Sequence, residues 1–200
     1  MFDARLRPLI DPVLDRMGAA LVRVGIGANP VSLAGAASGA LAGVAIGLGQ
    51  PLAGLVLVLA SRLLDGLDGA IARVKGPTDF GGYLDIVCDY VFYLAVPLGF
   101  GLAAPGNLPF ALLLVATFTL TAVSFLAYAA LAAKRGLETR AHGLKSFFYS
   151  TGLAEGAETL LAFILMCLWP AGFPVIASIF AGLCLLTVIQ RSVIAWRVFR

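Results

Sequence analysis

The chain has 200 residues, of which 60% are hydrophobic and only 12% charged, and its formal net charge is +3. Soluble globular domains carry roughly 25% charged residues, so this composition excludes an ordinary soluble domain and indicates an integral membrane protein. The apolar runs reach the roughly 20 residues that a helix needs to cross a bilayer, and alternating strand patterns are absent. We therefore expect an all-α membrane protein rather than a barrel.

The first 30 residues differ from the rest because charged residues interrupt their apolar positions. A secretory signal is excluded, since no small-residue cleavage site follows an apolar core. Asp11 is a suitable N-cap with Pro12 at the first helical position, and four apolar side chains then share one face: Val13, Leu14, Met17 and Leu21. We expect residues 1–30 to form an amphipathic leader helix on the membrane surface rather than a disordered tail.

Residues 31–200 contain about six apolar stretches of spanning length, which we expect to form one transmembrane domain. The segments "GQP", "APGNLP" and "WPAGFP" separate three pairs of them, because Pro and Gly break helices. The expected spans are residues 31–48, 52–74, 82–102, 108–133, 148–168 and 173–195.

The charged residues are distributed unevenly between the two sides of these spans. The three Pro- and Gly-containing turns carry no charge, whereas Lys and Arg gather near the termini and in the two remaining connections. An excess of Lys and Arg marks the cytoplasmic face of a membrane protein. We expect both termini and the two charged connections on the cytoplasmic side, at the inner membrane if the protein is bacterial.

Four aspartates occupy the second and third spans near their cytoplasmic ends. Asp65 and Asp68 are three residues apart, and Asp85 and Asp89 are four apart, so each pair shares one helix face. An ionised Asp within the membrane costs about 2.5–3.5 kcal/mol, so the cluster needs cations. Hard oxygen ligands suit Mg²⁺ or Mn²⁺, and two such ions form the arrangement that clamps a phosphorus centre. The alternative is a set of interfacial charges that reach water.

Small residues and an arginine accompany the carboxylates. Gly69 and Ala72 follow Asp68 on the same helix, Arg73 comes next, and Gly81 opens the third span. Small residues let a ligand approach the backbone closely, and a guanidinium offers paired donors to a pyrophosphate. We interpret this pattern as a site for a diphosphate-containing ligand.

At these positions the sequence resembles the CDP-alcohol phosphatidyltransferases. Their signature is D-x-x-D-G-x-x-A-R followed, after a short spacer, by G-x-x-x-D-x-x-x-D. The chain has "DGLDGAIAR" at residues 65–73 and "GGYLDIVCD" at residues 81–89, so all eight fixed positions match. Outside this window the resemblance is looser and consists of the six-span plan and the amphipathic leader.

The resemblance implies transfer of a phosphatidyl group from CDP-diacylglycerol to a small polar alcohol, with release of CMP and no covalent enzyme intermediate. It implies that Asp65, Asp68 and Asp85 hold two Mg²⁺ or Mn²⁺ ions, and that Asp89 adds a ligand and acts as the general base. The CDP-binding positions implied are Gly69, Ala72, Arg73 and Gly81. Members of the family are commonly homodimers, so we expect a homodimer in contact with membrane lipids and with no nucleic acid partner.

The acceptor is left open between phosphorylated alcohols, such as glycerol 3-phosphate or inositol phosphate, and unphosphorylated ones. Arg140 and Lys145 resemble the family's basic acceptor-binding positions, although topology and attraction to anionic lipids also explain basic residues in a cytoplasmic loop. Glu155 and Glu158 are three residues apart on the fifth span. They are acceptor-pocket candidates, since intramembrane carboxylates are functional candidates by default, and the alternative is that they pair with Arg140 or Lys145.

Two other functions share part of this pattern. An intramembrane Mg²⁺-dependent prenyltransferase would use aspartate-bound metal on an isoprenyl diphosphate, but such enzymes repeat their motifs in separate halves of a longer chain. A divalent-cation transporter would need polar groups near mid-membrane and on the outer side. The outer half of this protein is almost wholly apolar, so the phosphatidyltransferase is the leading hypothesis.

Overall fold

The computed structural model describes residues 3–136 and 155–200, and every regular element in this part of the chain is a helix. The prediction of an all-α protein is therefore confirmed. The α-helices are α1 (Asp3–Arg23), α2 (Ala28–Gly47), α3 (Pro51–Lys75), α4 (Asp79–Ala103), α5 (Leu108–Lys134), α7 (Gly156–Leu168) and α8 (Phe173–Phe199). Two short 3₁₀ turns, Pro105–Asn107 and Pro170–Gly172, lie in the predicted helix-breaking segments.

Four of these helices are long and apolar enough to cross a membrane: α2, α4, α5 and α8, the last two with their preceding 3₁₀ turns. Helix α3 has 25 residues, but its second half carries the charged motif. The described part of α7 has 13 residues, and the first residues of the fifth predicted span, 148–154, lie outside the described ranges. The count of six spans therefore stays a prediction.

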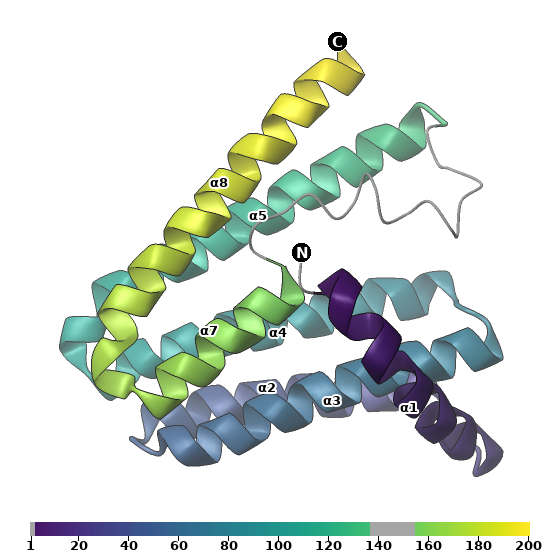
Figure 1. The fold of residues 1–200 in the computed structure, drawn as a ribbon, viewed down its shortest axis with the longest axis horizontal. Coiled ribbons are helices and arrows are strands. Elements are labelled where there is room, and N and C mark those ends of the chain that lie inside the picture. Colours follow the sequence, from purple (N-terminus) through teal and green to yellow (C-terminus); the bar gives the residue numbers. More distant parts are fainter. Residues whose placement is uncertain (1–2, 137–154) are drawn as a thin grey trace.

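The helices pack as a bundle in which α2 contacts both α3 and α4, while α5 lies along α8 and α3 along α7 (Figure 1). Glycines bring α2 and α4 into backbone contact. A Cβ at Gly39 would lie 2.9 Å from the Cβ of Phe92, and one at Gly43 would fall on the carbonyl oxygen of Ala95. Small residues permit this approach, as in membrane helix pairs generally.

The core of the bundle is aromatic. Phe92, Phe100, Phe163 and Phe173 are almost completely buried, and the rings of Phe100 and Phe173 stack with their centroids 4.7 Å apart. Large aliphatic side chains of the spanning helices point outward and are exposed. Such an outward apolar surface suits a lipid environment, where burial between helices depends on packing rather than on water exclusion.

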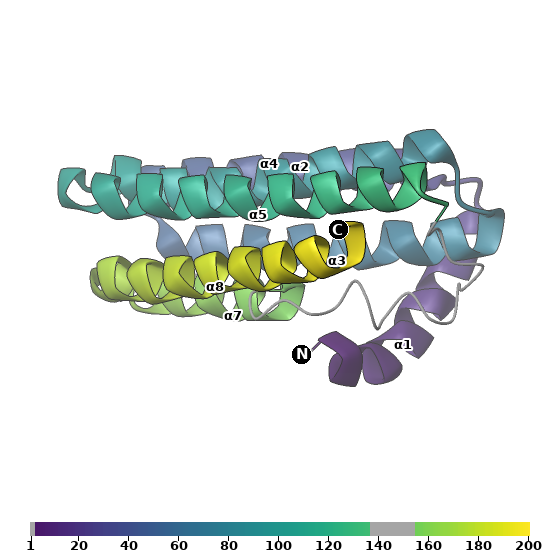
Figure 2. The same ribbon diagram turned by 90° about the horizontal axis from the view of Figure 1, so that it is seen from above.

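The bundle has two different ends. The α2–α3 turn and both 3₁₀ turns lie at the left end in Figures 1 and 2, while α1, the α3–α4 connection and the C-terminal ends of α5 and α8 lie away from it. The uncharged turns are thus separated from the charged connection and the termini, as the charge pattern predicted. The side of the membrane on which each end lies remains an expectation.

Helix α1 begins earlier than the sequence analysis expected. It starts at Asp3 and runs through Pro8 and Pro12, so Asp11 is not its N-cap. A proline inside a helix removes one hydrogen bond and bends the helix, and α1 is bent in Figure 2. The prediction that Asp11 caps the helix was wrong, because α1 already begins at Asp3, eight residues before Asp11.

The apolar side chains of α1 divide between two surroundings. Leu14 is buried with Leu67, Ala70 and Ile71 of α3, whereas Val13 and Met17 are exposed. The interface is close, since a Cβ at Gly66 would lie 2.8 Å from Leu14. The predicted apolar face therefore lies partly against α3 and leaves an exposed apolar strip compatible with a position at the membrane surface.

Candidate active site

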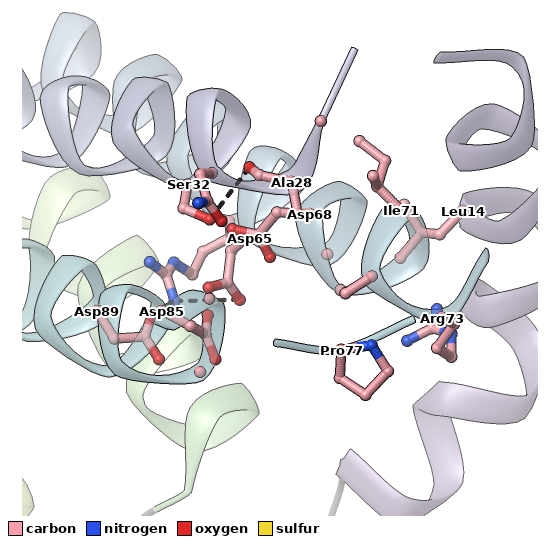
Figure 3. Close-up of a pocket in the computed structure, with 18 of the residues that line it drawn as sticks. Leu14, Ala28, Ser32, Asp65, Asp68, Ile71, Arg73, Pro77, Asp85 and Asp89 are labelled. Carbon is pink, nitrogen blue, oxygen red and sulfur yellow. Dashed lines mark hydrogen bonds and ion pairs between the residues drawn. The ribbon is translucent and has the colours of Figure 1, made fainter. Parts of the chain in front are cut away.

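Three of the predicted metal ligands lie together. Asp65 and Asp68 project from α3 and Asp85 from the first turns of α4, and one oxygen of each lies within 4.8 Å of the other two. Figure 3 shows these carboxylates pointing into one space between the two helices. Asp68 is only 5% exposed. Three converging carboxylates form the hard oxygen donor set that Mg²⁺ and Mn²⁺ prefer, so these residues fit a divalent ion.

Asp89 lies one turn further along α4 and has a different partner. Its Oδ1 accepts a hydrogen bond of 2.7 Å from the guanidinium of Arg62. The same guanidinium nitrogen lies 3.5 Å from Asp65. The structure thus brings all four aspartates to one site, and Arg62 lies between Asp65 and Asp89.

A cavity of about 990 Å³ opens at these carboxylates. Its wall includes all four aspartates together with the four small or basic motif residues, namely Gly69, Ala72, Arg73 and Gly81. All eight motif positions therefore line a single space. The volume lies at the upper end of the range for small-molecule sites.

The glycines of the motif leave room in different ways. A Cβ at Gly69 would meet only the flexible end of Arg73, at 3.6 Å, so this glycine leaves open space on the cavity side. A Cβ at Gly81 would lie 2.9 Å from the Thr78 hydroxyl. Thr78 caps α4 by accepting a hydrogen bond from the Gly81 N–H at 3.0 Å. Gly69 thus keeps space for a ligand, while Gly81 lets the cap close tightly.

Arg73 stands at the rim of the cavity and contacts α1. Its Nε and one terminal nitrogen donate to Oδ1 of Asp15, at 3.1 and 2.7 Å. Figure 3 shows Arg73 apart from the carboxylates, on the side of the pocket that faces α1. Both side chains of the pair are about half exposed, so a phosphate group could still reach the guanidinium.

The predicted acceptor residues are only partly described. Arg140 and Lys145 lie outside the described residues. Glu155 precedes α7 and Glu158 lies in its first turn. Neither glutamate lines the cavity, but their neighbours Gly156, Ala157 and Leu160 do. The first turn of α7 therefore reaches the cavity.

Arg135, at the end of α5, has a structural role. Its guanidinium donates to the carbonyl oxygens of Val198 and Phe199, at 3.2 and 2.6 Å, and so caps the C-terminal end of α8. Cations at that end of a helix are favourable.

Arg191 was counted with the charges near the C-terminus, but it lies within α8 and is not among the residues that line the cavity. It is half-buried within α8, and its guanidinium donates to the Thr121 carbonyl at 3.1 Å, inside the bundle. The signal was present in the sequence, since an arginine inside the apolar run 173–195 is a functional candidate by default. Arg62 also lay within a predicted span, but its partner Asp89 could not be identified from spacing.

Comparisons with known proteins agree on the family. The family model for CDP-alcohol phosphatidyltransferase matches residues 25–196. Inner membrane protein YnjF of Escherichia coli (strain K12) is 47% identical over 192 residues, which are 96% of this chain and 93% of YnjF. Archaetidylinositol phosphate synthase of Pyrococcus horikoshii is 35% identical over 101 residues, about half of each protein.

Solved structures show the same fold. The crystal structure of Mycobacterium tuberculosis phosphatidylinositol phosphate synthase (PgsA1) with CDP-DAG bound has a TM-score of 0.67 at 24% identity, over 92% of this chain and 94% of that one. The same enzyme in complex with manganese and citrate has a TM-score of 0.66 at 24% identity, over 92% and 88% of the two chains. With the family match over residues 25–196, the chain belongs to the CDP-alcohol phosphatidyltransferase family and is an enzyme of the phosphotransferase class.

Proposed function

We propose that the protein transfers a phosphatidyl group from CDP-diacylglycerol to a small polar alcohol and releases CMP. One observation carries this proposal: the carboxylate group and the small-residue wall of the motif line the same cavity. Two comparisons support it, because an archaeal relative is an archaetidylinositol phosphate synthase and a structure with the same fold was solved with CDP-DAG bound.

Asp65, Asp68 and Asp85 would hold the divalent metal, Mg²⁺ or Mn²⁺, with Asp89 as a further ligand, and the proposed stoichiometry is two ions. The convergence of the first three within 4.8 Å supports this assignment, as does the PgsA1 structure in complex with manganese. The bound ions would supply charge neutralisation at the diphosphate. With the ions bound, the charges of Asp65, Asp68 and Asp85 would be neutralised by metal rather than by a protein cation.

Asp89 would accept the proton of the acceptor hydroxyl. As the hydroxyl oxygen forms its bond to the phosphorus of the phosphatidyl group, the phosphorus–oxygen bond to CMP breaks and CMP leaves with the electron pair. A carboxylate beside the attacking oxygen is a suitable general base. The Asp89 side chain lines the cavity wall and is 28% exposed, which supports access by an acceptor.

Gly69, Ala72, Arg73 and Gly81 would bind the CDP group. The open space beside Gly69 allows close approach of a ligand to the backbone. The guanidinium of Arg73 offers donors to a phosphate oxygen at the rim of the cavity. The lipid chains of the substrate would stay in the bilayer while the nucleotide occupies the polar mouth.

The acceptor pocket, the assembly and the orientation complete the proposal. Arg140, Lys145, Glu155 and Glu158 remain candidates for an acceptor that is either phosphorylated or a plain alcohol. We also propose a homodimer, with residues 1–30 as an interfacial leader and residues 31–200 as the transmembrane catalytic domain. The E. coli relative is an inner membrane protein, and a site facing the cytoplasm would meet soluble acceptors there.

Purified protein in nanodiscs tests the reaction directly. It is mixed with CDP-diacylglycerol, Mn²⁺ or Mg²⁺ and one acceptor at a time: glycerol 3-phosphate, inositol phosphate, inositol, serine, or choline and ethanolamine derivatives. CMP is measured by chromatography. We expect CMP release that depends on one acceptor and on the metal.

Two matched substitutions on α4 serve as controls. Asp89→Asn should reduce the rate by about 10²-fold or more, as for loss of a general base. Asp79→Asn makes the same chemical change at an exposed position outside the cavity wall, and should leave the rate near that of the wild type. If no acceptor gives CMP above the Asp89→Asn background, the proposed reaction is wrong.

A further inference from the structure

Ser32 is a buried polar residue in the wall of the cavity. It lies near the start of α2, is 5% exposed, and stands outside both motif segments, 65–73 and 81–89. Its hydroxyl hydrogen-bonds to the carboxylate of Asp68 on α3, and Figure 3 shows the two side chains next to each other. Ser32 therefore connects α2 to the acidic site through a contact that the motif does not contain.

The usual role of a serine inside a membrane helix accounts poorly for Ser32. Hydroxyls of helical Ser and Thr commonly donate to the carbonyl oxygen four residues back. Elsewhere in the described helices such bonds measure 2.7 to 2.9 Å. The Ser32 hydroxyl instead lies 3.3 Å from the Ala28 carbonyl oxygen, outside the common range of about 2.5–3.0 Å. It is thus displaced from its own helix, and a carboxylate is the stronger acceptor.

The packing of α2 on α3 does not depend on this hydroxyl. Ser61 of α3 donates to the Gly35 carbonyl oxygen at 2.9 Å, and Ser38 of α2 donates to the Leu57 carbonyl oxygen at 3.0 Å. These two bonds already connect the helices in both directions. Stability of the helix pair is therefore a weak reason for a hydroxyl at Ser32.

Asp68 has few other groups that could orient it. Asp65 and Asp89 are partly exposed and lie within ion-pair distance of Arg62. Asp68 is only 5% exposed, and within the part of the chain that the structure describes it forms no ion pair. A hydrogen bond that orients a metal-ligating carboxylate typically contributes 10- to 100-fold to metal affinity, as an order of magnitude.

We propose that Ser32 is a positioning residue that orients the Asp68 carboxylate toward the divalent metal. This inference rests on the proposed function, in which the aspartates of α3 and α4 bind that metal. The hydroxyl donates a single hydrogen bond, so lone pairs on both carboxylate oxygens stay available to an ion. Through Ser32, helix α2 contributes to the geometry of a site whose four carboxylates belong to the other two helices.

A matched pair of substitutions isolates the hydroxyl. Thr and Val have nearly the same shape, so Ser32→Thr and Ser32→Val add the same bulk and differ in the hydroxyl. Mn²⁺ affinity is measured in nanodiscs by calorimetry and by the paramagnetic resonance of free Mn²⁺. We expect Ser32→Thr to bind Mn²⁺ about tenfold or more tightly than Ser32→Val. Equal affinities of the two variants would overturn the proposal.

Alanine substitutions separate metal binding from stability. Ser32→Ala should weaken Mn²⁺ binding by about tenfold or more. Ser38→Ala removes a hydroxyl from the same helix outside the cavity wall and should change the affinity by less than about twofold. With metal removed by a chelator, both variants should have similar midpoints of thermal unfolding, because each loses one hydrogen bond. If Ser32→Ala lowers only the midpoint and leaves Mn²⁺ affinity unchanged, Ser32 has a structural role and the inference is wrong.

A double variant shows whether Ser32 acts through Asp68. In the Asp68→Ala protein, adding Ser32→Ala should weaken the residual Mn²⁺ binding by less than about twofold, since no carboxylate is left to orient. An undiminished loss would mean that the hydroxyl contacts the ion itself, which would refute the positioning role. A wild-type protein that binds no Mn²⁺ would instead contradict the proposed function.

Discussion

Arg73 has two possible partners at the rim of the cavity, a protein carboxylate and the proposed nucleotide. In the structure it bonds Asp15 of α1 through two nitrogens. Both side chains are about half exposed, and exposed ion pairs contribute only about 0–1 kcal/mol to stability. A hydrogen bond from a guanidinium to a phosphate is worth more, about 1.5–3 kcal/mol. Nucleotide binding is therefore the stronger reason for an arginine at this position.

Substituting each partner separately distinguishes the two roles. We expect Arg73→Ala to raise the KM for CDP-diacylglycerol about tenfold or more, because the phosphate loses a charge-assisted donor. Asp15→Asn should change that KM by less than about threefold, since the guanidinium remains in place. Steady-state CMP release gives both values. Equal KM changes in the two variants would show that Arg73 acts only by attaching α1.

We expect a substitution of Gly69 to weaken ligand binding without lowering the stability of the fold. A Cβ there would contact only the terminal nitrogen of Arg73, at 3.6 Å, and alanine is the better helix former by about 1 kcal/mol. Gly69→Ala should therefore keep or raise the midpoint of thermal unfolding while weakening CDP binding about tenfold, as the methyl group occupies the ligand's space. Calorimetry with CDP and a thermal melt check the two halves. Unchanged CDP affinity would remove Gly69 from the proposed site.

At the scale of the elements, the α2–α4 contact determines the positions of the Asp85 and Asp89 carboxylates. Gly43 faces α4 so closely that a Cβ would fall on the Ala95 carbonyl oxygen, and a Cβ at Gly99 would fall on that of Gly43. This close contact seats α4 against α2, and the first turns of the same helix carry Asp85 and Asp89. Separation of the two helices would therefore displace half of the acidic site.

Gly43→Ala should separate α2 from α4. Overpacking of this kind costs about 1–3 kcal/mol, so we expect a lower midpoint of thermal unfolding in detergent. The matched control is Gly182→Ala on α8, where a Cβ would have no neighbour within 4 Å and alanine should be neutral or stabilising. If the Gly43→Ala and Gly182→Ala variants have the same midpoint of thermal unfolding, α2 and α4 have more room between them than the structure indicates.

The sequence predicted those features that depend on local order. Apolar runs and Pro-Gly turns placed the helices, because both signals lie within one element, and spacings of three and four placed the paired aspartates on common faces. Features that need tertiary contact were not predictable: Arg62 meets Asp89 from 27 residues away, and Arg73 meets Asp15 from 58 away. The start of α1 was misread because a capping pair is only a local preference and does not require the helix to begin there.

At the scale of the whole molecule, the distribution of charge separates two ends of the bundle. The site cavity opens near the α3–α4 connection, where Lys75 and Asp79 are exposed. The opposite end consists of uncharged turns such as Pro105–Asn107. Lys and Arg are retained on the cytoplasmic side of membrane proteins. Because the cavity opens at the charged end, we predict that it faces the cytoplasm. Soluble acceptors and released CMP would then exchange on that side.

Thiol labelling in bacterial spheroplasts tests this orientation. The three native cysteines, Cys88, Cys167 and Cys184, are buried and should react slowly with a membrane-impermeant maleimide. Gly106→Cys, at an exposed position in the uncharged turn, should be labelled in intact spheroplasts. Asp79→Cys, exposed at the charged end, should be labelled only after the membrane is permeabilised, because the reagent must reach the cytoplasmic face. The reverse pattern would place the cavity outside the cell, where cytoplasmic acceptors could not reach it.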